Sequence, residues 1–176
     1  RPAADALTTG ETATDTFSYT ITDDKLSDNA EIDITINGVN DAPILVDAIK
    51  TKKYTEGQGN VTVIDGSLTI RDVDDTNIET ATVAITGAFQ TSEDRLAFNN
   101  NFGITHAWNQ GTGILTLTGS TTKANYERAL QTVTYTNTDN TNPVLGLRTV
   151  TWTIIFAVSG GGVSRLVTTT SLNSSR

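Results

Sequence analysis

The chain has 176 residues and a net charge of −8, from 12 Lys and Arg against 20 Asp and Glu. This balance argues against nucleic acid or an anionic membrane as a partner, because phosphate groups would be repelled. There is no cysteine and only one histidine, which excludes disulfides, thiolate catalysis and Cys/His zinc sites. No apolar run approaches the ~20 residues that a membrane-spanning helix needs, so no membrane insertion is expected.

Two short segments near the start alternate between apolar and polar residues. They are DTFSYTI at 15–21 and EIDITI at 31–36, with the polar stretch TDDKLSDNA between them. Alternation at period two predicts two half-buried strands, and the polar stretch predicts the turn of a hairpin. Because an isolated hairpin is only marginally stable in water, its apolar face must be covered by something else.

The rest of the chain repeats this pattern of short β-branched runs separated by turn formers. Further strands are expected near 44–46, 61–64, 68–70, 81–85, 96–98, 115–117, 133–135, 150–156 and 166–169. Many short strands with turn signals between them are typical of a β-sandwich. The sequence therefore predicts an all-β fold.

One segment has helical spacing instead. In KANYERALQTV the apolar residues Tyr126, Ala129, Leu130 and Val133 fall at i, i+3, i+4 and i+7. Thr122 is placed to cap the first turn. A short helix is expected near 123–131, closing one side of the sandwich.

An internal repeat predicts how the chain is divided. DTFSYTI at 15–21 aligns with RTVTWTI at 148–154, an offset of 148 − 15 = 133 residues. Kept without gaps, the same offset places Ile34 over Val167 and Asn40 over Asn173. We therefore expect residues 1–41 to be the last two strands of one repeat, and residues 42–176 to be one complete repeat.

Two acidic stretches could hold a cation. Asp72, Asp74 and Asp75 lie together in RDVDDTN, and Asn40 and Asp41 lie in NGVNDAP between the two predicted units. Carboxylate and carbonyl oxygens that converge from separate loops are what Ca²⁺ requires. Taken alone, each stretch is equally compatible with a solvated turn.

These residues resemble known repeat families. Residues 4–43, ending in NGVNDAP, are similar to the carboxyl half of a VCBS-type repeat. The order YTEGQ, IRDVDD and NQGTGILTLTG in the second unit resembles bacterial cadherin-like repeats. The resemblance implies Ig-like (cadherin-like) sandwiches strung end to end in large secreted bacterial surface proteins and adhesins, with no enzymatic role.

The resemblance also implies calcium sites. It assigns Asn40, Asp41, Asp72 and Asp74 to one Ca²⁺ site at the joint, with Asp75 as a possible extra ligand. Three further residues are implied at other joints, Glu56 at the far end of the second unit and Asp23 and Asp24 toward a preceding repeat. The terminal SLNSSR lacks the NDAP signature and FAVSGGGVS carries no carboxylate, so at most one complete calcium joint is expected.

The expected partners follow from the same pattern. They are neighbouring repeats, or further copies of this chain joined head to tail into a filament by strand addition. The alternative function is a carbohydrate-binding module, in which an exposed Trp108 on a Thr- and Asn-rich loop would stack on surface glycans. The lone His106 beside it is expected to be a structural or surface residue rather than a catalyst. The expected location is extracellular, at a bacterial cell surface.

Overall fold

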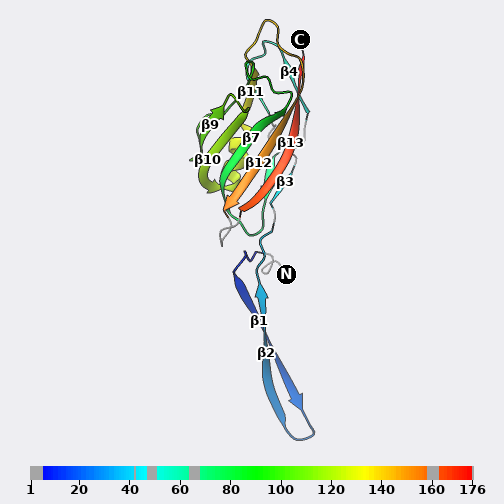
Figure 1. Ribbon diagram of the computed structural model, residues 1–176. Coiled ribbons are helices and arrows are strands. Elements are labelled where there is room, and N and C mark those ends of the chain that lie inside the picture. The colour runs from blue at the N-terminus through cyan, green and yellow to red at the C-terminus, as the bar shows by residue number, and fades with distance from the viewer. Residues whose placement is uncertain (1–5, 42, 47–50, 64–67, 158–162, 176) are drawn as a thin grey trace.

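The computed structural model describes residues 6–41, 43–46, 51–63, 68–157 and 163–175, with backbone only for 157 and the last range. A long β-hairpin projects from one end of a larger β-sheet unit, and the chain passes between the two through NGVNDAP (Figure 1).

The hairpin consists of β1 (Thr12–Thr22) and β2 (Ser27–Asn37). Its register pairs Phe17 with Ile32, and the two strands form a sheet of their own. The predicted hairpin is therefore confirmed, with its turn at 23–26.

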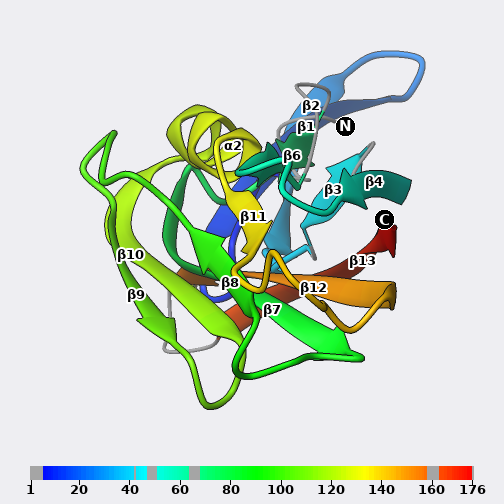
Figure 2. The same cartoon turned by 90° about the horizontal axis from the view of Figure 1, so that it is seen from above.

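The larger unit consists of three further sheets. The six-stranded sheet has the order β4-β13-β12-β7-β10-β9, and its strands are β4 (Thr51–Thr55), β7 (Asn77–Gly87), β9 (Thr105–Asn109), β10 (Ile114–Thr122), β12 (Gly146–Ala157) and β13 (Val163–Ser175). The facing sheets have the orders β5-β11-β8 and β3-β6, and their strands are β3 (Ile44–Val46), β5 (Val61–Thr62), β6 (Thr69–Arg71), β8 (Asp94–Ala97) and β11 (Thr134–Asn137). Seen from above, β8 and β11 form one layer over β7 and β12 (Figure 2). The expected all-β sandwich is thus confirmed.

The core lies between these layers. Buried side chains come from both, among them Trp152 of β12, Tyr135 of β11 and Leu96 of β8. The predicted helix is present as α2 (Lys123–Gln131), where Thr122 Oγ1 accepts the N–H of Asn125 as the N-cap. Its Tyr126, Ala129 and Leu130 are buried, so the helix closes one side of the core as expected.

Two strands were not predicted. In β4, TKKYT, only Tyr54 is buried. In β9, THAWN, no side chain is fully buried, because the strand lies at the edge of its sheet. Edge strands need little apolar alternation, which is why the sequence pattern does not reveal them.

The gapless repeat alignment is wrong for the second strand of the pair. Asp15 pairs with Ile34 in the hairpin, whereas its counterpart Arg148 pairs with Leu172, five residues beyond the expected Val167 (172 − 167 = 5). The pairing of β12 with β13 continues two pairs beyond the equivalent of Thr22 with Ser27, and the residues between the last pair are one more in number, which together give the five-residue shift. By this register SLNSSR corresponds to DITING at 33–38, which precedes the NDAP signature, so its lack of that signature says nothing about a second joint.

Candidate metal centre

The joint is held by close contact between its glycine and the segment before β1. Gly38 N donates to Glu11 O at 2.8 Å. A Cβ on Gly38 would lie 2.2 Å from Thr8 O and 2.7 Å from Leu7 O, so only glycine fits here. Asn40 N donates to Thr9 Oγ1 at 3.1 Å, which fixes the chain two residues further on.

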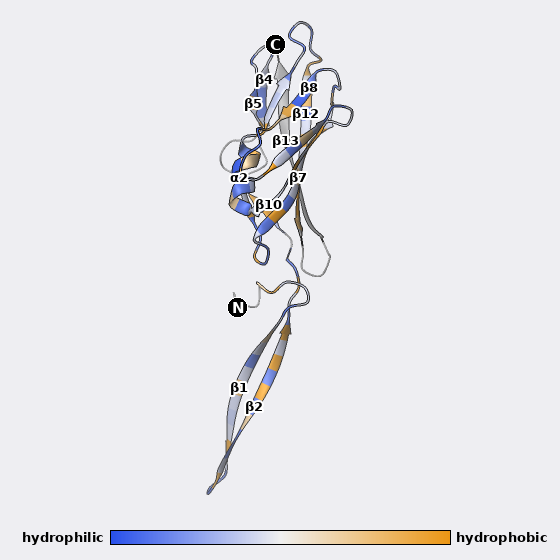
Figure 3. Ribbon diagram, turned by 90° about the vertical axis from the view of Figure 1, so that its left-hand side faces the viewer, coloured by the Kyte–Doolittle hydropathy of each residue, from blue (hydrophilic) through white to orange (hydrophobic). Residues whose placement is uncertain are grey.

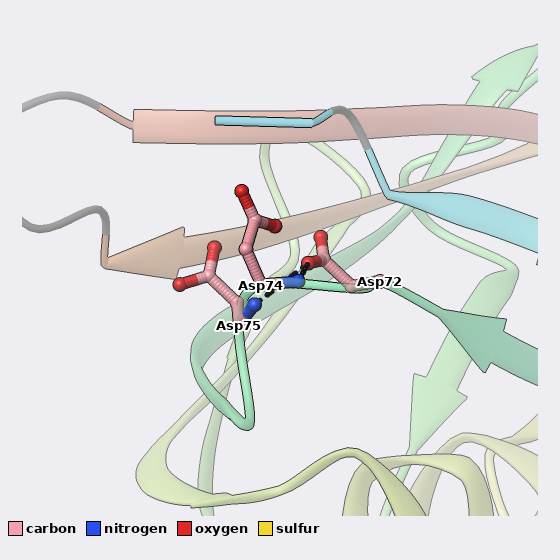
Figure 4. A group of neighbouring side chains, drawn as sticks. All are labelled: Asp72, Asp74 and Asp75. Atoms are coloured by element: carbon pink, nitrogen blue, oxygen red, sulfur yellow. Dashed lines mark hydrogen bonds between the residues drawn. The ribbon is translucent and has the colours of Figure 1, made fainter. Parts of the chain in front are cut away.

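The three aspartates form a compact loop directly after β6. Asp72 Oδ1 accepts the backbone N–H groups of Asp74 at 3.3 Å and Asp75 at 2.8 Å. This local capping turns the chain so that all three carboxylates lie together (Figure 4). One carboxylate oxygen from each residue lies within 4.8 Å of the others.

The joint and this loop touch each other. Asp41 N donates to Asp74 Oδ2 at 2.8 Å, and Asn40 Nδ2 donates to Asp41 O at 2.7 Å. The Asp41 N–H thereby joins the linker to the aspartate loop, and within the described residues Asp72, Asp74 and Asp75 are the acidic residues whose carboxylate oxygens lie within 4.8 Å of one another. Asp41 reaches the cluster through its backbone, while the residue itself is exposed.

Burial and close contact in the loop shift the pKa values of the three carboxyl groups. Burial raises the pKa of Asp72 to about 6, and a hydrogen bond shared with Asp74 adds to the rise. Burial alone would also raise the pKa of Asp74, but hydrogen bonds from the Asp72 carboxyl and Asp41 N–H outweigh it and lower that pKa. Burial, helped by the charge of Asp74, raises the pKa of Asp75. Burial is therefore the main cause of the two raised pKa values, and the neighbouring carboxylates add to it.

Four side-chain oxygens of the predicted ligands are buried and accept no hydrogen bond within the described part of the chain. They are Asn40 Oδ1, Asp72 Oδ2, Asp74 Oδ1 and Asp75 Oδ2. A buried acceptor without a partner is unfavourable, and native proteins rarely tolerate one. These donors are all hard oxygens, and three belong to carboxylates, so the set fits Ca²⁺ better than a softer metal.

Lys123, at the start of α2, supports the loop from the main-chain side. Its Nζ donates to Asp72 O at 2.6 Å and to Asp75 O. It binds backbone carbonyls of the loop, and its charge also acts to lower the pKa of Asp75. We did not predict this residue from the sequence, because a lysine at the start of a helix gives no signal of the loop it contacts.

The remaining predicted metal residues lie elsewhere. Glu56 directly follows β4, and β4 ends beside the last residues of β13, away from the joint (Figure 1). Asp23 and Asp24 lie in the turn between β1 and β2, at the far tip of the hairpin. Asp23 Oδ1 accepts the N–H groups of Lys25 and Leu26 at 2.8 Å each, and these bonds lower its pKa. Their roles at other joints stay predictions.

Trp108 packs as part of the scaffold. Its ring meets Phe89 edge to face with centroids 6.3 Å apart, and its indole N–H donates to Gln110 Oε1 at 2.8 Å. His106 is exposed and its Nδ1 is hydrogen-bonded to Asn100 Oδ1 at 2.7 Å. Neither residue is assembled with other reactive side chains in the part of the chain that is described.

Comparison with known proteins gives one sequence relative and several structural ones. No family model matches the chain. It is 40% identical over 113 residues to halomucin of Haloquadratum walsbyi (strain DSM 16790 / HBSQ001), which covers 61% of this chain and 1% of that protein. The chain therefore spans a very small part of this relative.

The structural matches are cadherin ectodomains. Mouse clustered PcdhgC3 EC1-3 matches with a TM-score of 0.37 at 10% identity, covering 98% of this chain and 45% of that chain. The protocadherin gammaB7 EC3-6 cis-dimer matches with a TM-score of 0.40 at 12% identity, covering 94% and 34%. Likeness at this level assigns no function.

Among the described residues, no helix is long and apolar enough to cross a membrane.

Proposed function

We propose that the chain is a non-enzymatic structural and adhesive repeat of an extracellular surface protein of bacterial type, with a Ca²⁺-stiffened joint between its two units. The observation that carries the proposal is the set of buried side-chain oxygens without hydrogen-bond partners, contributed from both sides of the joint. The similarity to 113 residues of the much longer halomucin supports a place as one part of a large protein.

The joint residues have separate tasks in this proposal. Asn40 and Asp41 approach from the linker, and Asp72, Asp74 and Asp75 come from the sandwich. A bound Ca²⁺ supplies positive charge that oxygens from both units share. Bending the joint would pull Asn40 and Asp41 away from the loop and separate these oxygens. The joint is therefore expected to resist bending when calcium is present, which suits a spacer.

Calorimetric titration of the chelator-treated chain with CaCl₂ tests the site. Asp74→Asn removes one carboxylate at the centre of the cluster and is expected to weaken Ca²⁺ binding by at least about tenfold. Asp28→Asn removes the same charge from the exposed hairpin and should leave binding unchanged. Unchanged binding in Asp74→Asn, or an equal loss in both variants, would contradict the proposed site.

Stiffening requires a second measurement, because a site could bind calcium without restraining the joint. The chain has no cysteine, so Ser18→Cys and Thr112→Cys place one spin label on the hairpin and one on the sandwich. We expect the distance distribution between the labels to narrow on adding Ca²⁺ and to broaden with chelator. If the distance distribution did not change with calcium, the site could still bind Ca²⁺, but it would have no mechanical role.

Glycan binding receives no support from the structure. The indole N–H of Trp108 is already bonded and its ring packs against Phe89, so the residue on which that alternative rests has a scaffold role.

A further inference from the structure

The end strand of the six-stranded sheet, β9, has an edge with which no strand in the described ranges pairs. β9 pairs with β10 along one side and lies on the outside of the molecule (Figure 2). Asn109 O accepts the N–H of Gly113 at 2.9 Å in the turn that leads to β10. Because successive residues of a strand direct their N–H and C=O groups to opposite sides, His106 and Trp108 direct theirs to the open edge. This edge therefore offers two donors and two acceptors.

The open edge lies in the longest uncharged stretch of the sequence. Residues 96–122, which include all of β9 and β10, contain no Asp, Glu, Lys or Arg. The whole chain nevertheless carries 20 acidic and 12 basic residues and a net charge of −8. A net charge of this size keeps copies of a protein apart. Two copies that approach along the β9 edge bring no like charges together in this stretch.

Other strand edges carry the protection that natural sheets use against unwanted pairing. β4, the opposite end strand of the same sheet, contains Lys52 and Lys53. The hairpin strand β2 alternates hydrophobic residues with hydrophilic ones (Figure 3), and three of its residues are acidic, namely Asp28, Glu31 and Asp33. Charged side chains on an edge disfavour the addition of a further strand.

The smaller sheets are protected by cover and by buried charge. β6 pairs with β3 along one edge, and the Ile70 N–H donates to Glu127 Oε1 of α2 at 2.7 Å. β8 contains the exposed Arg95 and the buried Asp94, whose Oδ2 accepts Arg148 Nε at 3.1 Å. β9 has none of these devices, since THAWN contains no Asp, Glu, Lys, Arg or Pro and pairs with β10 without a bulge.

We propose that β9 is a pairing edge for a second copy of this chain, which adds antiparallel about a two-fold axis at Ala107. In this register His106 of each copy lies opposite Trp108 of the other, and each such pair exchanges two N–H···O bonds. Four hydrogen bonds then use all the main-chain groups at the edge. A register centred on His106 would use fewer, because it places Trp108 opposite Ile104, whose N–H is already bonded to Asn101 O at 2.8 Å.

The side chains of β9 suit this register. Ala107 is exposed, and its small side chain leaves room at the axis. On the other face of the strand, the His106 ring meets Phe98 edge to face with centroids 5.9 Å apart, and Trp108 packs against Phe89. Pairing would place His106 beside Trp108 of the second copy, and cross-strand aromatic pairs stabilise sheets.

The resulting pair is closed, because both copies use the same edge. It joins two sandwiches side by side, in contrast to the head-to-tail filament expected from the hairpin. Neither the joint nor calcium takes part, so the pairing goes beyond the proposed function.

Cysteine cross-linking tests the register, because the chain contains no cysteine. In the proposed pair the two Ala107 residues form a non-hydrogen-bonded pair with Cα atoms about 4.5 Å apart, within the range of a disulfide. Two Thr105 residues would lie about 13 Å apart along the strands. Ala107→Cys is therefore expected to oxidise to a disulfide-linked dimer at least about tenfold faster than Thr105→Cys. The two positions are matched, since both are exposed residues of β9.

A proline tests the hydrogen bonds of the edge. His106→Pro removes an N–H that points away from β10, a position where an edge strand tolerates proline. His106→Gln removes the ring and keeps the N–H. In the Ala107→Cys chain, His106→Pro should lower the rate of cross-linking to that of Thr105→Cys, while His106→Gln should keep most of it. Thermal melting shows whether His106→Pro remains folded.

Two results would overturn the proposal. Equal rates for Ala107→Cys and Thr105→Cys, whether both are fast or both are negligible, would show that the edge does not pair in this register. That comparison does not depend on whether His106→Pro folds. Fast cross-linking of Ala107→Cys that a folded His106→Pro leaves unchanged would show that the main chain of the edge does not hold the two copies together.

Discussion

The two hairpins of this molecule share a sequence pattern but not an environment. In β12 the apolar residues of the repeat are buried in a sandwich, while in β1 their counterparts face solvent. The polar residues alternate in the same way in both. The comparison teaches that alternation determines which face of a strand is apolar, whereas burial depends on what the rest of the fold supplies.

Substitution of a charged residue should give the largest difference between the two hairpins in the free energy of unfolding. Arg148→Met leaves Asp94 buried without its ion pair and is expected to reduce the free energy of unfolding by about 3–5 kcal/mol. Asp15→Met at the equivalent place on the hairpin should change it much less, because Asp15 is only partly buried. Urea denaturation of both variants measures the difference. Similar effects at the two positions would contradict the view that the two strands lie in different environments.

A pair of identical residues makes the same comparison without charge. Ile154 is 1% exposed and its counterpart Ile21 is 67% exposed. Ile154→Ala should lower the free energy of unfolding by about 2–5 kcal/mol through lost burial and a cavity, and Ile21→Ala by no more than about 0.5 kcal/mol. Thermal melting of both variants checks this. If Ile21→Ala were equally damaging, the hairpin would be packed in solution against a partner.

The joint between the two regions should respond to a single methyl group. Gly38→Ala places a Cβ against the carbonyls of Leu7 and Thr8, and the resulting overpacking is expected to cost about 1–3 kcal/mol locally. The spin-label distance distribution should broaden while the melting of the sandwich stays unchanged. Gly111→Ala is the control, because its Cβ would meet only Asn109 Oδ1 at 3.5 Å. Equal behaviour of the two variants would show that the joint is not held by this contact.

Much of the fold could be predicted because the strands that build the core alternate clearly. The helix was equally predictable, since its apolar spacing and the Thr122 cap are local signals. β4 and β9 were missed because edge strands with few buried residues carry little pattern. The register of β13 was missed because an alignment of one strand does not show how far its pairing with the next strand continues.

The sequence named the candidate ligands, but it did not reveal the contacts that support the aspartate loop. Asn40, Asp41 and the three aspartates came from motif resemblance, and their contact across 33 residues appears only in the structure. The buried oxygens without partners could not be inferred from sequence, since they depend on packing. Lys123 was missed for the same reason: it is distant in sequence from the loop it holds.

Lys123 gives the smallest expected effect and separates two explanations of the site. By charge alone, Lys123→Met should strengthen Ca²⁺ binding, because it removes a cation beside the carboxylates. If Lys123 instead holds the loop through the carbonyls of Asp72 and Asp75, the same change should weaken binding, by about tenfold. We expect weakening, measured by calorimetry, with Lys25→Met on the hairpin turn as the matched loss of charge. Tighter binding in Lys123→Met would show that the loop keeps its shape without Lys123, and that the charge of this residue affects Ca²⁺ binding more than its hydrogen bonds do.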